Sequence, residues 1–149
     1  MKSNRTTDLA SIHFAISRVN GLYARWAQMH DVNFYAMHIF YFLQKRGPVT
    51  QKQISEDSKI PKQSINNVII TLKKDGYISI IPGSRDRREK IIALTEKGRG
   101  YIQEKLMPLH EIEERVLKKM GAELIRQLIA STTAYGDYFE REMSKEVSV

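Results

Sequence analysis

The sequence contains no cysteine among its 149 residues, which excludes disulfide bonds, thiolate metal ligands and switching by direct thiol oxidation. It has no apolar run as long as a membrane-spanning helix needs, and Met1 to Arg5 are followed by no secretory-type apolar segment. Repeats and low-complexity tracts are also missing. We therefore expect a cytoplasmic protein of one domain, or of two small packed ones, and the 42% hydrophobic residues are enough for a core.

Enzyme signatures are missing as well. There is no phosphate-binding glycine loop, no nucleophile elbow and no His-Glu-x-x-His motif. The 4 histidines, His13, His30, His38 and His110, have no tight metal-ligand spacing. We expect no catalytic activity, no cofactor and no bound metal.

The formal net charge is +7, and most of it lies in one segment. Residues Lys45 to Lys90 hold 11 Lys and Arg against 5 Asp and Glu, whereas the rest of the chain holds 13 against 12. This concentration favours a polyanionic partner, because the release of counterions drives such binding. A basic protein whose charge served only solubility would not be expected to concentrate it in this way.

Two short helices are predicted inside this basic segment. Thr50 and Gln53 form a capping-box pattern at the start of the first helix, and Ile54 is its main inward residue. Pro61 suits the first position of the second helix, where a missing N–H costs nothing, and Gly76 should end that helix in a left-handed conformation. The second helix is expected to bury four apolar residues at helical spacing: Ile65, Val68, Ile69 and Leu72.

Two β runs follow, Tyr77 to Ile81 and Lys90 to Leu94, and Val49 is expected to add a short third strand. The loop between the two runs has three arginines where hairpins usually prefer plain turn residues: Arg85, Arg87 and Arg88. Helix, turn, helix and basic hairpin together predict a winged helix-turn-helix, an arrangement that reads duplex DNA.

Three phrases of this region resemble those of MarR-type transcriptional regulators: Leu72-Lys73-Lys74-Asp75-Gly76-Tyr77-Ile78, Asp86-Arg87-Arg88 and Leu94-Thr95-Glu96-Lys97-Gly98. Their order around a basic hairpin makes the resemblance specific, and the flanking helices extend it over nearly the whole chain. The resemblance implies a homodimer that binds a pseudo-palindromic operator in double-stranded DNA as a repressor. It also implies release from DNA by a small aromatic or anionic effector.

The outward face of the second helix carries residues suited to base edges, since asparagine and glutamine can bond adenine and lysine can donate to guanine. A merely solvated polar face would look similar, but the arginines of the hairpin favour DNA contact, because guanidinium groups suit narrow minor grooves. By resemblance, Arg87 enters the minor groove, while Asp86 and Arg88 shape the wing, partly through an ion pair. The expected DNA contacts are Thr50 and Gln51 to phosphate, together with Lys62, Gln63, Ser64, Asn66, Asn67, Thr71, Arg85, Arg87 and Arg88.

Long amphipathic helices are predicted on both sides of this region. They span Asp8 to Met29, Thr95 to Met120 with a kink at Pro108, and Ala122 to about Met143, with frayed residues from Ser144 onward. The inward series of the middle helix is Ile102, Leu106, Leu109, Ile112, Val116 and Leu117. One winged region cannot cover all these apolar faces, so we expect a second copy of the chain to cover them.

A helix that is apolar almost all round, Phe34 to Leu43, should follow the N-cap Asn33 and end at Gly47-Pro48. His38 within it is a ligand contact, a pH sensor or, as we favour, a core histidine with a satisfied hydrogen bond. Candidates for an effector cleft are Trp26, His38 and Tyr41, although core packing explains them equally well.

The predicted fold is mostly α with a small β wing. Residues 33–96 are expected to form the winged helix-turn-helix, and residues 1–32 and 97–149 the helical dimerisation region. Two other interpretations stay open: a winged-helix module that binds protein or RNA without operator specificity, and an enzyme, for which the sequence offers no positive sign.

Overall fold

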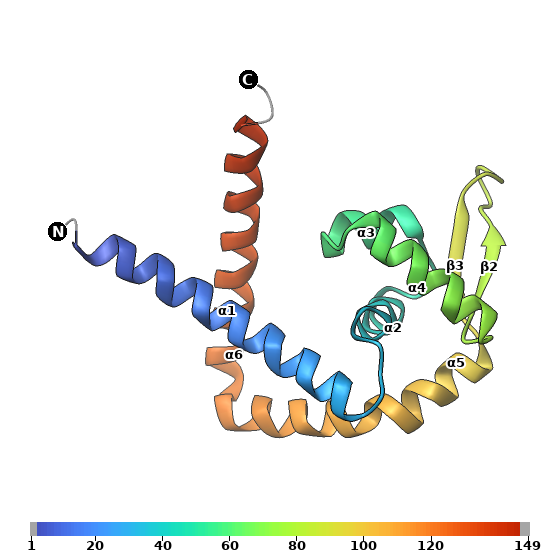
Figure 1. Ribbon diagram of the computed structural model, residues 1–149, viewed down its shortest axis with the longest axis horizontal. Coiled ribbons are helices and arrows are strands. Elements are labelled where there is room, and N and C mark those ends of the chain that lie inside the picture. The colour runs from blue at the N-terminus through green and yellow to red at the C-terminus, as the bar shows by residue number, and fades with distance from the viewer. Residues whose placement is uncertain (1–2, 147–149) are drawn as a thin grey trace. The chain divides into compact units, whose positions relative to one another are not determined.

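The computed structural model describes residues 3–146 of the chain, and the side chains of residues 8–146. Figure 1 shows the elements in chain order: α1 (Ser3–Met29), α2 (Phe34–Arg46), β1 (Val49–Thr50), α3 (Gln51–Ser58), α4 (Lys62–Lys74), β2 (Ile78–Pro82), β3 (Lys90–Leu94), α5 (Glu96–Tyr101), the π-helical turn η1 (Ile102–Leu106) and α6 (Met107–Glu146). The predicted fold, mostly α with a small β wing, is confirmed. Within this range, none of the helices combines the length and the apolarity that crossing a bilayer requires.

The chain forms two compact units that divide between Met107 and Pro108. The first unit contains α1 to η1, and the second contains nearly all of α6. The predicted assignment of residues 33–96 to DNA binding and of the terminal helices to dimerisation stays a prediction.

Helix α2 supplies the largest buried side chains of the first unit. Met37, Ile39 and Phe40 are at most 1% exposed, as expected for a helix that is apolar almost all round. The N-cap Asn33 accepts a hydrogen bond from the Ala36 N–H at 2.9 Å, and the predicted cap is confirmed. Four other elements each add a large, fully buried residue to this core: Ile54 from α3, Ile65 from α4, Ile92 from β3 and Leu106 from η1.

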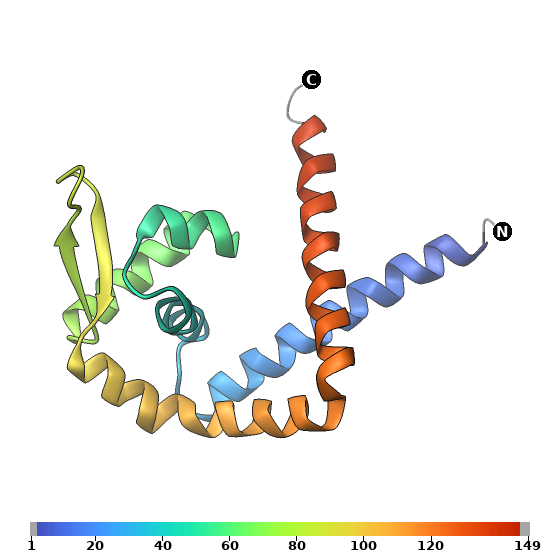
Figure 2. The same cartoon turned by 180° about the vertical axis from the view of Figure 1, so that it is seen from behind.

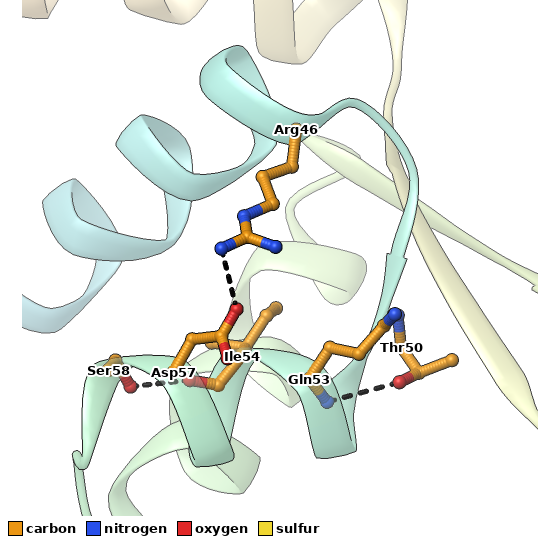
Figure 3. A network of polar contacts seen from close by, with 6 residues as sticks. All are labelled: Arg46, Thr50, Gln53, Ile54, Asp57 and Ser58. Atoms are coloured by element: carbon orange, nitrogen blue, oxygen red, sulfur yellow. Dashed lines mark hydrogen bonds and ion pairs between the residues drawn. The ribbon is translucent and has the colours of Figure 1, made fainter.

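Helix α3 begins with the predicted capping box (Figure 3). Thr50 Oγ1 accepts a hydrogen bond from the Gln53 N–H at 3.1 Å, and Gln53 Oε1 accepts one from the Thr50 N–H at 2.8 Å. The Arg46 guanidinium, at the end of α2, reaches the Asp57 carboxylate of α3 at 3.0 Å. These contacts fix where α3 starts and tie it to the helix before it.

Helix α4 buries the four predicted residues Ile65, Val68, Ile69 and Leu72. Pro61 is its N-cap and not its first residue, so the predicted start is one residue too early. Gly76 follows the helix with φ at 78°, as predicted. The N–H of Gly76 bonds the Lys73 carbonyl at 3.0 Å and that of Tyr77 bonds the Leu72 carbonyl at 2.9 Å, the two bonds of a Schellman motif.

The three strands form one antiparallel sheet in the order β1-β3-β2, and the predicted third strand at Val49 pairs with Ile92. Strand β2 begins at Ile78, one residue later than predicted, because the Tyr77 N–H caps α4. In Figures 1 and 2 the tip of the β2–β3 hairpin lies at the end of the strands away from α5. The loop that carries the arginines therefore lies at the free end of the hairpin.

A junction of hydrogen bonds joins the end of α4, the hairpin and the start of α5. Thr95 Oγ1 donates to the Gly76 carbonyl at 2.6 Å and accepts from the Gly98 N–H at 3.0 Å, while the Thr95 N–H donates to the Tyr77 carbonyl at 3.1 Å. A Cβ atom on Gly98 would lie 2.0 Å from the Tyr77 carbonyl oxygen. Only glycine fits there, which gives the Leu-Thr-x-x-Gly phrase a physical reason.

The predicted helix from Thr95 to Met120 is interrupted before Pro108. The Met107 N–H donates to the Ile102 carbonyl, five residues earlier, so η1 is a π-helical turn. Met107 directly precedes Pro108, which has no backbone N–H to donate. The predicted break at Gly121 is confirmed, with φ at 76°. Helix α6 continues to Glu146, so fraying at Ser144 to Glu146 is wrong, and the Ser144 hydroxyl donates to the Glu140 carbonyl at 2.8 Å. Residues 147–149 lie outside the described range.

Many apolar side chains of the long helices are exposed in the single chain. Ile102, Leu106 and Leu109 are buried as predicted, whereas Ile112, Val116 and Leu117 are 40–48% exposed. The inward prediction is wrong for these three residues within the part of the chain that the structure describes. Other exposed apolar residues are Ile12, Ile16, Val19 and Leu22 of α1, and Leu124, Leu128, Ile129, Tyr138 and Phe139 of α6.

Candidate nucleic-acid interface

The side of α4 opposite its buried stripe is polar and basic. At 100° per residue, the direction opposite the buried side chains passes through Gln63, Asn67, Ile70 and Lys74. We call these four residues, together with the adjoining Asn66 and Thr71 and the exposed Lys62 of the first turn, the reading face. All are exposed except the half-buried Asn66. Ser64 lies toward the flank of the helix and is also half-buried.

Two amide side chains of the reading face are joined. Gln63 Nε2 donates to Asn67 Oδ1 at 3.1 Å, and the Thr71 hydroxyl donates to the Asn67 backbone carbonyl at 3.2 Å. This arrangement leaves the Gln63 side-chain oxygen as an acceptor and the Asn67 side-chain nitrogen as a donor. One acceptor and one donor are what the major-groove edge of adenine requires.

A second amide pair joins the two helices of the helix-turn-helix. Gln51 Nε2 of α3 donates to Asn66 Oδ1 of α4 at 3.4 Å, and both residues are half-buried. The oxygen of Asn66 is therefore occupied within the protein, while its nitrogen is still a possible donor. Thr50 accepts the capping bond through Oγ1 and retains its hydroxyl proton for a phosphate oxygen.

The tip of the hairpin is held by backbone contacts that leave its arginines exposed. The Gly83 N–H donates to the Glu89 carbonyl at 2.8 Å, and a Cβ atom at Gly83 would lie 2.5 Å from the Asp86 carbonyl oxygen. None of the three guanidinium groups has an ion pair with any residue that the structure describes: Arg85, Arg87 and Arg88. These charges are available to an external anion.

The role of Asp86 differs from the one implied by resemblance. Its Oδ1 accepts a hydrogen bond from the backbone N–H of Arg88 at 2.9 Å, an Asx-type turn, and no ion pair with the Arg88 guanidinium forms in the described chain. Asp86 therefore shapes the wing through the backbone, and the Arg88 side chain is not needed for that contact.

The three candidate cleft residues lie on α1 and α2. Trp26 is 9% exposed, stacks on the His30 ring at a centroid distance of 4.1 Å, and its Nε1 has no hydrogen-bond partner among the described residues. His38 is half-buried, with its ring edge-on to Phe34 at 4.5 Å, and burial lowers the pKa of its imidazole. Tyr41 is half-buried three positions further along α2, on the same side of that helix as His38.

One residue of the reading face was missed by sequence reasoning. Ile70 is 58% exposed, although it belongs to an apolar run, Val68-Ile69-Ile70, that suggests burial. Its spacing of seven from Gln63 is the signal that places it on the outward side of the helix.

Comparisons with known proteins match the central part of the chain to one family. A MarR family model matches residues 30–89, from just before α2 to the tip of the wing. The HTH-type transcriptional regulator PetP of Rhodobacter capsulatus is 32% identical over 74 residues, which cover 50% of this chain and 45% of that protein. YwaE of Bacillus subtilis, an HTH-type transcriptional regulator by name, is 29% identical over 91 residues, which cover 61% and 53%. The matched segments thus span about half the length of these curated relatives.

Solved structures agree over a longer part of the chain. A MarR family regulator from Neisseria meningitidis has a TM-score of 0.81 and 27% identity, covering 93% of this chain and 98% of that one. The regulator BldR from Sulfolobus solfataricus, with a TM-score of 0.71, 18% identity and coverage of 93% and 99%, supports the fold alone. Residues 30–89 therefore match the MarR family, and the chain has the fold of a MarR family regulator. That family consists of DNA-binding regulators and not of enzymes.

Proposed function

We propose that this protein is a sequence-specific regulator that binds duplex DNA in the cytoplasm as a homodimer. It represses transcription by occupying a pseudo-palindromic operator. The observation that carries the proposal is the reading face of α4, whose joined Gln63 and Asn67 amides are exposed, together with the unpaired arginines of the hairpin. A helix in the major groove and a basic loop at the adjacent minor groove use both features.

The exposed apolar side chains of α1 and α6 support the homodimer. Leu22 on α1 is 54% exposed, and Leu124, Leu128 and Phe139 on α6 are 50–55% exposed, whereas soluble surfaces rarely expose continuous apolar stripes. A second copy covers such stripes and also supplies a second winged region. Two winged regions related by a two-fold axis match two half-sites.

We further propose that a small aromatic or anionic ligand lowers the affinity for DNA. The buried Trp26 Nε1 has no partner among the described residues. Its N–H could donate to an oxygen of a ligand that lies beside the indole ring, which supports a ligand site there. The regulator NadR, a protein of the same fold with a TM-score of 0.69 and 17% identity, is described in complex with 4-hydroxyphenylacetate. We expect phenolic acids to raise the unfolding temperature of the parent protein, and to raise it less for Trp26→Phe. Unfolding temperatures that never change with any phenolic acid contradict the ligand.

The main test separates contacts that hold the backbone of DNA from contacts that read bases. Arg87→Ala should weaken binding to operator and to random duplex alike, and should reduce the salt slope by about one unit per wing, because one cationic contact is lost. Asn67→Ala should cost about 1–3 kcal/mol at the operator, with random duplex little changed, because a base contact is lost. Fluorescence anisotropy over a salt series measures both.

Exposed residues outside the winged region serve as controls for these variants. Arg115→Ala on α6 and Asn20→Ala on α1 remove the same chemical groups and should bind both duplexes like the parent protein. If Arg87→Ala and Asn67→Ala also bind the operator like the parent, the proposed interface is wrong. Stronger binding to single-stranded RNA than to any duplex would favour the alternative, a winged-helix module that binds RNA.

A further inference from the structure

Ile70 is an apolar side chain in the middle of a polar and basic helix face. It is 58% exposed, whereas the neighbouring Ile69 is 3% exposed and Leu72 is 5% exposed. Single exposed apolar residues are common on protein surfaces, so exposure by itself means little. The position of Ile70 is what matters, because its side chain is mostly exposed and lies among groups suited to base edges.

The neighbours of Ile70 on the helix surface are the amides of the reading face. It follows Asn66 by four positions and Asn67 by three, and residues at these spacings stand next to one another along a helix. Gln63, which donates to Asn67, lies on the same stripe seven positions earlier. A binding partner that contacts the amides of Gln63 and Asn67 therefore also comes within reach of the Ile70 methyl groups.

The positive charge around the reading face indicates which kind of partner binds there. The segment from Lys45 to Lys90 carries 11 basic residues against 5 acidic ones, and Lys62, Lys73 and Lys74 of α4 itself are exposed. An apolar protein surface would have to desolvate these ammonium groups, whereas a polyanion pairs with them. In duplex DNA the major groove offers one apolar group, the C5-methyl of thymine.

We infer that Ile70 is a specificity-determining residue that contacts the methyl group of a thymine next to the base read by the Gln63–Asn67 pair. This inference rests on the proposed function and adds a base preference to it. An aliphatic side chain discriminates thymine from cytosine at that position by burying the methyl group, without any hydrogen bond.

The test removes only the methyl group from DNA. Duplexes bound by the full-length parent are first selected from a random-sequence library, and each thymine of the selected duplex is then replaced by deoxyuridine. At one position of each half-site, loss of the methyl group should weaken binding of the parent about fourfold per half-site, the value of roughly one buried methyl. The same replacement should not weaken binding by the Ile70→Ala variant. For the Ile70→Val variant, it should weaken binding nearly as much as it does for the parent. Anisotropy titrations measure all of these affinities.

Ile81→Ala is the matched control, since Ile81 is an exposed isoleucine of β2, 47% exposed and outside the reading face. The Ile81→Ala variant should bind the deoxyuridine duplex more weakly than the thymine duplex, by the same factor as the parent. Alanine favours helix over isoleucine, so Ile70→Ala should fold normally, which thermal unfolding checks. If a sequence is selected but no thymine position distinguishes the parent from Ile70→Ala, the inference is overturned and the proposed function stands. If no sequence is enriched at all, the proposed function fails and the inference fails with it.

Discussion

Gly98→Ala should destabilise the protein by about 3 kcal/mol or more, because the added methyl group meets a backbone atom that cannot move away. The new Cβ would lie 2.0 Å from the Tyr77 carbonyl oxygen. That oxygen is held by the Thr95 N–H at 3.1 Å, and moving α5 outward would break the bond between Thr95 Oγ1 and the Gly98 N–H. Urea unfolding followed by circular dichroism, at one fixed protein concentration, measures the change.

Gly100→Ala is the matched control for this substitution. Gly100 lies two residues further along α5, and a Cβ atom there would meet nothing within 4 Å, so the alanine methyl group points into open space. Because alanine is a better helix former than glycine, this variant should gain up to about 1 kcal/mol. Equal unfolding midpoints for Gly98→Ala and the parent would show that the close approach at Tyr77 does not exist in solution.

Leu128→Lys should convert the proposed dimer to a monomer and weaken binding to a two-site duplex by about a hundredfold or more, because the second winged region no longer binds from the same molecule. Leu128 is 53% exposed in the single chain and lies on one face of α6 with Leu124 and Phe139. A lysine ammonium group there would have to be desolvated inside an apolar interface. Light scattering after size-exclusion chromatography gives the mass, and anisotropy gives the affinity.

Ala130→Lys adds the same charge to the same helix two residues away, on the opposite face at 100° per residue. It is exposed as well, and it should leave both mass and affinity unchanged. A parent protein that is a well-behaved monomer at micromolar concentration would contradict the proposed dimer, as would a Leu128→Lys variant that keeps the mass of a dimer.

Features set by neighbouring residues in the chain could be predicted from the sequence. The capping box of Thr50 and Gln53, the left-handed Gly76 and the buried side of α4 depend on spacings of three or four residues, and all three are confirmed. Element boundaries are harder to predict where one N–H has two possible partners. Tyr77 extends the strand in the prediction, but its N–H bonds the Leu72 carbonyl in the structure.

Two kinds of feature could not be read from local pattern alone. Ile112, Val116 and Leu117 have the spacing of an inward stripe, but helical spacing does not say which surface covers that stripe, and all three are exposed in the described structure. The hydrogen bond from the Arg88 backbone to Asp86 depends on the path of the loop, whereas the sequence displays only two opposite charges. The predicted DNA contacts themselves stay predictions, since they concern a partner molecule.

The Gly76–Thr95–Gly98 junction has a mechanical consequence. It ties the last turn of α4 and the base of the hairpin to the first turn of α5 through three hydrogen bonds at 2.6–3.1 Å. If α5 rotates, α4 and the hairpin therefore rotate with it as one rigid body. We therefore expect a constant span between the proposed major-groove and minor-groove contacts of one protomer. In the proposed dimer, the quantity that can change is the separation between the α4 helices of the two protomers.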